Sequence, residues 1–185
     1  MATSHVDPHQ RSQDTRRRIL EMAVSLREDR NGGSVDHYLA LLQDRLPLWL
    51  SILHELSHRS GKGSVSDNLL PVAQAGIDYY LEVQGAALPA FTSPTVTVRF
   101  REAIRDTGLG PREEIAPLAA YLAAEQQLGR IRPDVDPEAS ARLLVAGCFH
   151  RAYIEMFIGA DSGPTREASA REIVRELRLE PMVHA

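Results

Sequence analysis

The feature that most constrains the fold is an apolar helix in the second half of the chain. The run from Leu143 to Ile158, LLVAGCFHRAYIEMFI, carries apolar residues on nearly every face when it is read as a helix. A helix that is apolar on all sides has to be covered on all sides. Because a chain of 185 residues has little core to surround it, the sequence predicts that a partner chain covers one side.

The residues before this helix predict where it begins. An amphipathic pattern over 111–128 places apolar residues at i, i+3, i+4 and i+7, namely Ile115, Leu118, Ala119 and Leu122. Gly129 stands where a glycine commonly ends a helix. In the linker RPDVDP, Asp136 is a predicted N-cap and Pro137 fits the first helical position. The sequence therefore predicts two helices joined by a short Pro/Asp linker.

This stretch, from Leu118 to Gly159, resembles the last core helices of bacterial regulators of the tetracycline-repressor (TetR) family. In that family an amphipathic helix, a G-x-I/L-x-P-D-x-D-P linker and an apolar helix lead into the dimer-forming end of the ligand-binding domain. The linker here reads GRIRPDVDP. The resemblance extends roughly over residues 13–29 and 35–180, and it implies a fold and a function that the residues alone do not.

The first predicted helix also resembles the family. It follows the pattern T-R-x-x-I-L-x-A-A at Thr15, Arg16, Ile19, Leu20 and Ala23, with Met22 in place of the first alanine. In TetR regulators this helix supports a helix-turn-helix whose second helix enters the major groove. Here only Asn31, Gly32 and Gly33 precede the next predicted helix, which begins near Ser34. The chain therefore resembles a TetR-type regulator whose DNA-reading element is missing.

A basic cluster lies at the start of the first helix. Arg16, Arg17 and Arg18 are candidates for contacts with DNA phosphates, which position a protein without selecting a sequence. The alternative, which we favour, is that these arginines form a solvated helix end.

Helical periodicity, together with capping residues, glycines and prolines between the periodic segments, predicts an all-α bundle of about seven helices. Three segments are expected: a flexible arm over 1–12, a remnant first helix of a DNA-binding head over 13–33, and a ligand-binding and dimerisation domain over 34–180. By resemblance, the last two helices pair with their copies in a homodimer, forming a four-helix interface. The expected interface residues are Ala139, Leu143, Gly147, Ile173 and Leu177.

The resemblance also implies a ligand cavity between the helices of residues 47–129 and the apolar helix. Such pockets are mostly apolar with a few converging polar groups. A small apolar or amphipathic molecule is the expected ligand. The candidate contact residues, each of which also fits an ordinary core position, are Trp49, Leu53, Tyr80, Phe91, Phe100, Tyr121 and Phe149.

One motif points to an enzyme instead. His54-Glu55-Leu56-Ser57-His58 matches H-E-x-x-H, in which two histidines one helical turn apart bind zinc and the glutamate activates water. Ser64 stands where an extended motif needs a third histidine, although Glu82 is a conceivable third ligand. No convincing strand accompanies the motif to hold a substrate. We therefore expect no catalytic site and no bound metal or cofactor.

Composition restricts the remaining classes. No apolar run is long enough to span a bilayer, and the N-terminal residues lack the apolar stretch of a signal peptide, so a cytoplasmic protein without a membrane partner is expected. The single cysteine, Cys148, excludes an intrachain disulfide. The net charge of −4 argues against a nucleic-acid binder that relies on overall positive charge.

The first functional expectation is thus a TetR-type, ligand-responsive transcriptional regulator, with DNA as a partner if a reading head exists. The alternative is a ligand-binding and dimerising module without DNA binding. A zinc metallohydrolase using residues 54–58 is a distant third, and an unrelated helical scaffold protein predicts neither a pocket nor a dimer.

Overall fold

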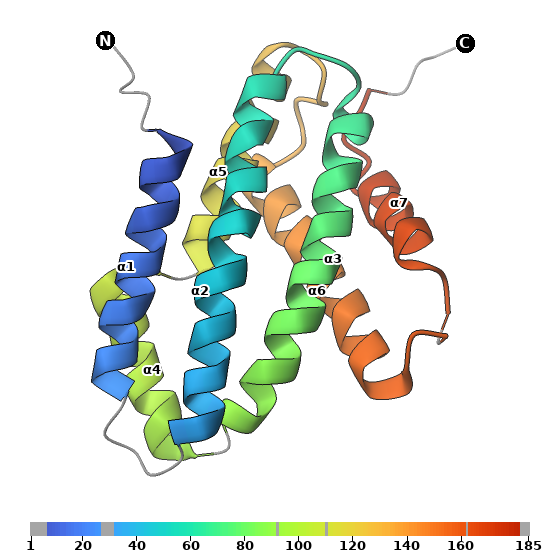
Figure 1. Cartoon of the computed structure of the whole chain (residues 1–185). Helices are drawn as coiled ribbons and strands as arrows, with labels where there is room; N and C mark the ends of the chain where they lie inside the picture. Colours follow the sequence, from blue (N-terminus) through green and yellow to red (C-terminus); the bar gives the residue numbers. More distant parts are fainter. Residues whose placement is uncertain (1–6, 27–31, 92, 110, 162, 182–185) are drawn as a thin grey trace. The chain divides into compact units, whose positions relative to one another are not determined.

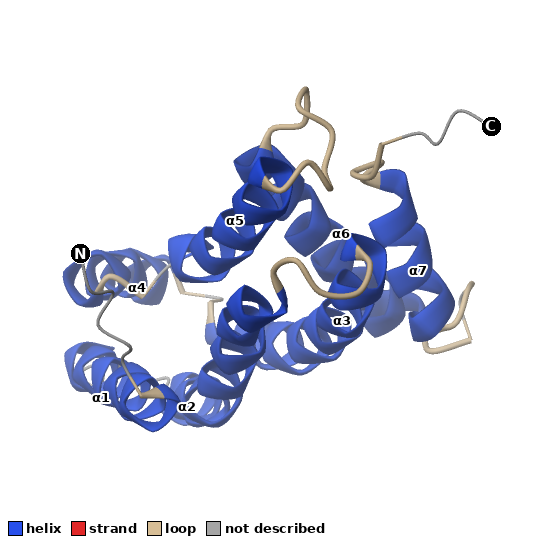
Figure 2. Ribbon diagram, turned by 90° about the horizontal axis from the view of Figure 1, so that it is seen from above, coloured by secondary structure: helices blue, strands red, loops and turns tan. Residues whose placement is uncertain are grey.

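The computed structural model describes residues 7–26, 32–91, 93–109, 111–161 and 163–181, and its regular elements there are all helical, with no strand (Figure 2). The described residues thus confirm the predicted all-α class. Seven α-helices and one short 3₁₀ helix follow one another along these residues (Figure 1): α1 Pro8–Leu26, α2 Gly32–Glu55, η1 Leu56–Arg59, α3 Val65–Ala90, α4 Pro94–Thr107, α5 Pro111–Gln127, α6 Pro137–Ile158 and α7 Arg166–Glu176.

The chain divides into two compact units. Unit 1 comprises residues 1–51 and 82–110, and unit 2 comprises residues 52–81 and 111–185. This division differs from the domain boundary expected after residue 33, because α1 belongs to the same unit as the first part of α2. The chain passes from one unit to the other inside α2, inside α3 and again between residues 110 and 111, and only this last crossing falls in a Gly/Pro-rich stretch, GLGP. A boundary inside a continuous helix leaves no Gly/Pro-rich linker in the sequence to mark it.

In unit 1, α1 packs against α4 (Figure 1). Ile19 and Met22 of α1 are buried. The Nε atom of Arg18 donates a hydrogen bond to the backbone oxygen of Thr107, at 2.7 Å, where α4 ends. Gly108 follows in the left-handed conformation, with φ of 65°, which a glycine adopts without strain. Gly108 thus ends α4 as its C-cap.

The start of α1 corrects the predicted flexible arm. Residues 8–12 belong to the helix, and only residues 1–6 lie outside the described part of the chain. The Asp7 side chain accepts a hydrogen bond from the backbone N–H of His9 at 3.0 Å, and the backbone oxygen of Asp7 accepts one from Arg11 at 3.1 Å. Asp7 followed by Pro8 is an N-cap and first-position pair, a signal that the sequence analysis missed.

Unit 2 is built around α6, which lies between α5 and α7 (Figure 2). One face of α6 is buried in this unit, at Ala141, Leu144, Cys148 and Ala152. Burial raises the pKa of the Cys148 thiol to about 12, and its sulfur contacts the backbone oxygen of Ala73 at 3.4 Å. The thiol therefore behaves as a small apolar core group.

Side chains cap the first turns of the last two helices, and the predicted N-cap at Asp136 is confirmed. The Asp136 side chain accepts hydrogen bonds from the backbone N–H groups of Glu138 and Ala139, at 2.9 and 3.1 Å. Thr165 accepts one from Ala168 at 3.1 Å. These caps fix the points where α6 and α7 begin.

Gly147 allows the close approach of α6 and α7. A Cβ atom built on Gly147 would lie only 3.0 Å from Cγ1 and 3.1 Å from Cγ2 of Ile173. Gly147 was expected as an approach point between subunits, and here it is already an approach point within the chain. In α3, by contrast, Gly85 has no atom within 4 Å of its own Cβ position.

We expect the substitution Gly147→Ala to reveal this contact. In the Ile173→Ala background it should raise the free energy of unfolding by about 1 kcal/mol, because alanine favours a helix more than glycine does. In the parent chain the crowding against Ile173 should cancel that gain. Gly85→Ala is the control and should stabilise both backgrounds. Urea unfolding measures all of these differences, and a full gain from Gly147→Ala in the parent chain would contradict the crowding.

Candidate functional site

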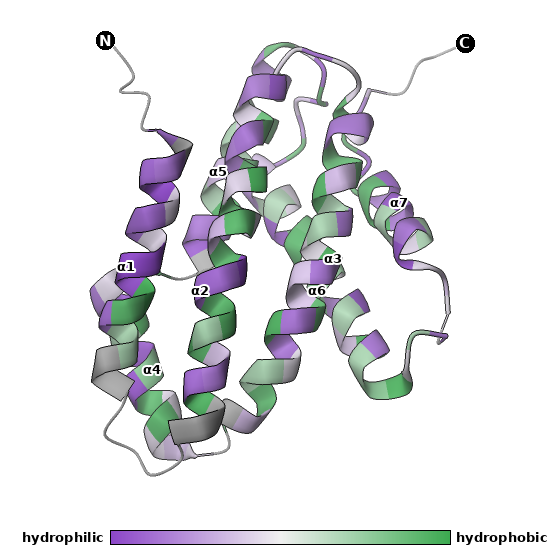
Figure 3. Ribbon diagram, in the orientation of Figure 1, coloured by the Kyte–Doolittle hydropathy of each residue, from purple (hydrophilic) through white to green (hydrophobic). Residues whose placement is uncertain are grey.

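One side of α6 exposes several large hydrophobic side chains. Leu143, Ala146, His150, Tyr153 and Phe157 are all exposed and follow one another at spacings of 3, 4, 3 and 4 residues. We call this set the α6 outer face. Leu143 is 63%, Tyr153 45% and Phe157 59% exposed. The last turns of α6 are largely in the hydrophobic colour (Figure 3). This spacing is that of the seam along which one helix packs against another.

The sequence predicts that α6 needs cover on two sides, and the structure identifies the side that unit 2 leaves open. Five of the eleven large hydrophobic side chains exposed among the described residues belong to α6. Tyr153 and Phe157 also stack, with ring centroids 4.6 Å apart. Neither was a candidate site residue, although their heptad spacing from Leu143 is a signal that could have found them.

A groove of about 400 Å³ runs between α6 and α7. It is lined by Gly147, His150, Arg151, Ile154, Pro164, Ser169, Glu172, Ile173 and Glu176. Arg151 is buried, and its Nη2 lies 3.1 Å from Oε2 of Glu155. In the described part of the chain its Nε and Nη1 atoms have no hydrogen-bond partner. The groove thus has apolar and charged lining residues on both helices, with Ile154 and Arg151 on α6 and Ile173 and Glu172 on α7.

The residues expected in a dimer interface gather in this region. Leu143 is exposed on the outer face of α6, and Ala139 lies half-buried one turn before it. Gly147 and Ile173 contact each other and line the groove. Leu177 is half-buried at the end of α7.

The residues expected in a ligand cavity are spread over both units. Trp49, Phe91 and Phe100 belong to unit 1, whereas Leu53, Tyr80, Tyr121 and Phe149 belong to unit 2. Trp49, Leu53 and Tyr121 are at most 2% exposed. These three occupy core positions, the alternative that the sequence analysis left open for each residue.

The other four candidates form two aromatic pairs. In unit 2 the rings of Tyr80 and Phe149 meet edge to face, with centroids 5.6 Å apart, and the Tyr80 hydroxyl donates a hydrogen bond to Glu114. Burial and the neighbouring carboxylate both raise the pKa of Tyr80, so the hydroxyl stays a donor. In unit 1 the rings of Phe91 and Phe100 are 4.6 Å apart and line an open hollow of about 640 Å³.

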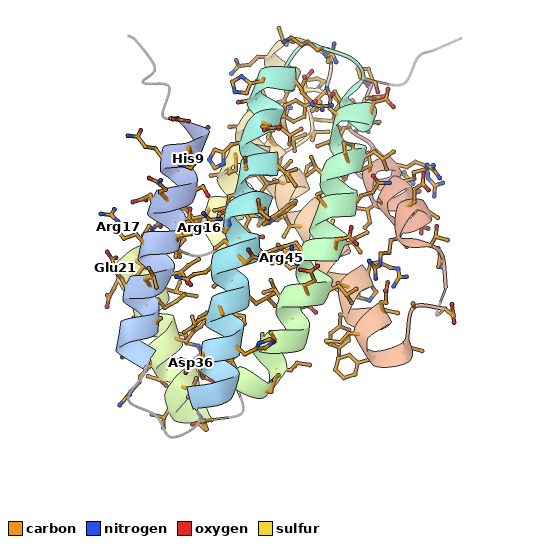
Figure 4. The ribbon with its side chains drawn as sticks, in the orientation of Figure 1. His9, Arg16, Arg17, Glu21, Asp36 and Arg45 are labelled. Carbon is orange, nitrogen blue, oxygen red and sulfur yellow. The ribbon has the colours of Figure 1, made fainter. Side chains whose placement is uncertain are left out.

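The three clustered arginines of α1 have different surroundings in the structure. Arg17 points outward from α1 and pairs with Asp14, while Arg16 lies on the side toward α2 (Figure 4). The guanidinium of Arg18 is engaged with Thr107, as described above. Arg18 is therefore a contact within unit 1, which leaves only Arg16 and Arg17 exposed for a phosphate.

The H-E-x-x-H motif does not lie on a single α-helix. His54 and Glu55 end α2, whereas His58 belongs to η1, whose tighter winding changes the relative direction of the two histidines. Glu82 pairs with Arg45 at 2.6 Å; Arg45 is labelled in Figure 4. No group of three or more His, Cys, Asp or Glu side chains that could hold a metal ion is found among the described residues. The structure thus adds no support to the zinc alternative.

In the part of the chain that the structure describes, no helix combines the length and apolar character that crossing a bilayer requires. Comparison with protein families, with curated proteins and with solved structures finds no match to this chain.

A buried carboxylate fixes the geometry of the α6–α7 region. Glu155 is 7% exposed, and its Oε1 and Oε2 both accept from Nε of Arg166 at 3.1 Å. Arg166 reaches on to Asp78 of α3 at 2.7 Å. Hydrogen bonds from Arg166 hold the pKa of Glu155 below its ordinary value of 4.5, with Arg151 adding a smaller effect of the same sign. This cluster ties α7 to α6 and α3.

We expect Glu155→Gln to lower the free energy of unfolding by about 3 kcal/mol at pH 7, because it leaves Arg151 buried without its carboxylate. The folded-state pKa of Glu155 is depressed, so its contribution is complete above pH 4.5 and is lost as pH falls below that value. The difference between parent and variant should therefore shrink in acid. Urea unfolding from pH 7 to pH 3 measures it.

The matched control is Glu167→Gln, which removes an exposed partner of Arg171 and should cost well under about 1 kcal/mol. A Glu155→Gln variant as stable as this control at pH 7 would contradict the anchoring role of Glu155.

Proposed function

We propose that this chain is the ligand-binding and dimer-forming part of a TetR-type transcriptional regulator, and that it does not itself read DNA sequence. The observation that carries the proposal is the α6 outer face, a helix-packing seam exposed on the very helix whose sequence resembles the family's dimer-forming region. The order of the seven helices along the described chain supports it further.

A second copy of the chain is the occupant that suits the α6 outer face best. The seam suits a copy of itself, because the small Ala146 and the polar His150 separate the large side chain of Leu143 from those of Tyr153 and Phe157. Two such seams related by a twofold axis can interlock large residues with small ones. The neighbouring α6–α7 groove offers further surface to the same partner. This pairing would supply the cover that the apolar helix lacks in one chain.

The connection between α1 and α2 supports the second half of the proposal. Five residues, 27–31, separate the end of α1 from the start of α2. A helix-turn-helix needs at least one further helix at this point in the family pattern. We propose that the chain acts by binding a small molecule and by pairing, either with itself or with a related chain that carries a complete DNA-reading head.

We expect light scattering during gel filtration to give twice the 20.5 kDa mass of one chain. Leu143→Glu and Phe157→Glu should each shift the protein to the monomer, since each places a charge in the seam without disturbing the buried face of α6. Leu48→Glu is the control, because Leu48 is similarly exposed, at 52%, on α2. A monomeric parent chain, or a dimer that survives both seam variants, would contradict the proposal.

A DNA titration tests the absence of sequence reading. The purified chain is titrated with its own upstream region and with an unrelated duplex at two salt concentrations. We expect weak binding to both duplexes alike, decreasing with salt and weakened by the double variant Arg16→Gln/Arg17→Gln, because such contacts involve phosphates only. Tight binding with a clear preference for the upstream region would show that the chain reads DNA after all.

A further inference from the structure

The open hollow in unit 1 is not explained by pairing through α6. Its volume is about 640 Å³, within the range of small-molecule sites. It is lined by Phe91, Thr97, Phe100, Arg101, Ile104 and Arg105. Five of these six residues come from a single helix, α4, and Phe91 directly follows the end of α3.

The hollow exists because α4 has two different apolar faces. Val96 and Ala103 lie on the buried face. Thr97, Phe100 and Ile104 occupy positions i, i+3 and i+7 of another face, a spacing typical of a helix surface that packs against something. All three are only half-buried, so unit 1 does not complete their cover.

Aromatic rings stiffen the wall of this hollow. Tyr38 of α2 is buried and meets Phe91 and Phe100 edge to face, with centroids 5.3 and 5.8 Å apart. Phe91 and Phe100 in turn lie 4.6 Å from each other. Three rings in mutual contact restrict one another's rotamers, so the apolar wall is present before any ligand arrives.

Two arginines stand at the edge of the apolar wall. Arg101 and Arg105 are one helical turn apart and exposed, and Nε of Arg105 donates to the backbone oxygen of Arg101 at 3.3 Å. Neither forms an ion pair with any carboxylate that the structure describes. Glu102 and Asp106 each follow one of these arginines, and Glu102 also precedes Arg105 by three residues, but neither carboxylate forms an ion pair with Arg101 or Arg105 among the described residues. The hollow thus has an apolar wall and a cationic edge.

We infer that the hollow binds a small single-tailed amphiphile with an anionic head, of the chemical class of a medium-chain fatty acid. The tail lies against Phe91, Phe100 and Ile104, and the carboxylate lies between the guanidinium groups of Arg101 and Arg105, which bind carboxylates through charge-assisted hydrogen bonds. The inference rests on the proposed ligand-binding function, for which it names the class of ligand and a site confined to unit 1.

The dimensions favour a small molecule over a protein partner. The exposed face of α4 spans only from Thr97 to Arg105, about two helical turns, whereas a docked helix is usually held by anchors over a longer stretch. A neutral apolar ligand would leave the paired arginines without a role. An anionic amphiphile uses both parts of the site.

Calorimetric titration with decanoate, below its micelle concentration, tests the inference. We expect one decanoate per chain, and weaker binding of decan-1-ol and of decyltrimethylammonium, which carry the same tail with a neutral or cationic head. The double variant Arg101→Gln/Arg105→Gln should weaken decanoate binding about threefold to thirtyfold, as expected for two exposed charge pairs. It should leave the binding of decan-1-ol unchanged.

The control double variant is Arg171→Gln/Arg175→Gln, which removes two exposed arginines of the same spacing from α7. It should bind decanoate like the parent chain. Equal affinity for decanoate and decan-1-ol, an equal loss in both double variants, or binding that appears only with decanoate-containing vesicles would overturn the inference.

Protection of an introduced cysteine from alkylation tests where the ligand binds. Decanoate should slow the alkylation of a Thr97→Cys variant by iodoacetamide, because Thr97 lines the hollow. It should not slow the alkylation of Thr95→Cys, which is exposed on α4 outside the lining. The native Cys148 is buried and should not react.

Unprotected Thr97→Cys in the presence of bound decanoate would overturn the assigned site. The monomeric Leu143→Glu variant should retain decanoate binding, and loss there would likewise overturn the assignment to unit 1. Dimer formation and DNA binding are measured without decanoate. A failure of this inference is therefore distinguishable from a failure of the proposed function.

Discussion

Much of unit 2 depends on how α6 is covered. Ala141, Leu144, Cys148 and Ala152 are buried, and they place α6 between α5 and α7. Burial of apolar surface is the main favourable term in folding, so this face determines where the neighbouring helices lie. The opposite side, the α6 outer face, carries the large side chains of Leu143, Tyr153 and Phe157 and has no cover within unit 2. Unit 2 covers only one of the two apolar sides of α6. The proposed pairing follows because a partner chain can cover the other side.

Buried carboxylates add specific hydrogen bonds to this apolar packing. Glu155 accepts hydrogen bonds from Arg166 and so holds the start of α7 against α6. Glu125, which is fully buried, accepts from the backbone N–H of Gly61 at 2.9 Å and from Nε of Arg130 at 2.5 Å, tying the loop after η1 to the end of α5. A buried carboxylate must have such partners, because its desolvation is costly. Each therefore specifies a single arrangement of the segments that it joins.

The two candidate surfaces divide the proposed function between the two units. The α6 outer face in unit 2 is long, apolar and regularly spaced, which suits another helix. The hollow in unit 1 is short, aromatic and edged by Arg101 and Arg105, which suits a small anionic amphiphile. A regulator of the proposed kind needs both properties, a surface that pairs and a site that senses. In the proposal DNA is read by a separate element, which a related partner chain would supply.

The helices and their ends could be predicted from the sequence, because they depend on residues close together in the chain. Periodicity located the helices, and the caps at Asp136 and Thr165 and the glycine at Gly108 stand where their side chains or backbone freedom require them. The start of α1 was missed although Asp7 and Pro8 carry the same kind of signal.

Only the tertiary structure decided which apolar residues are core and which are surface. Trp49, Leu53 and Tyr121 are core, while Phe157 is exposed, yet all four are bulky side chains that by type alone suit a core. Periodicity fixes which residues share a helix face, whereas exposure depends on whether a residue distant in the chain arrives to cover that face. Arg18 likewise contacts Thr107, 89 positions away, which no local pattern encodes. The sequence by itself thus determined the helices and their ends. The tertiary structure decided which of their faces remain for function, because burial is set by contacts between distant segments.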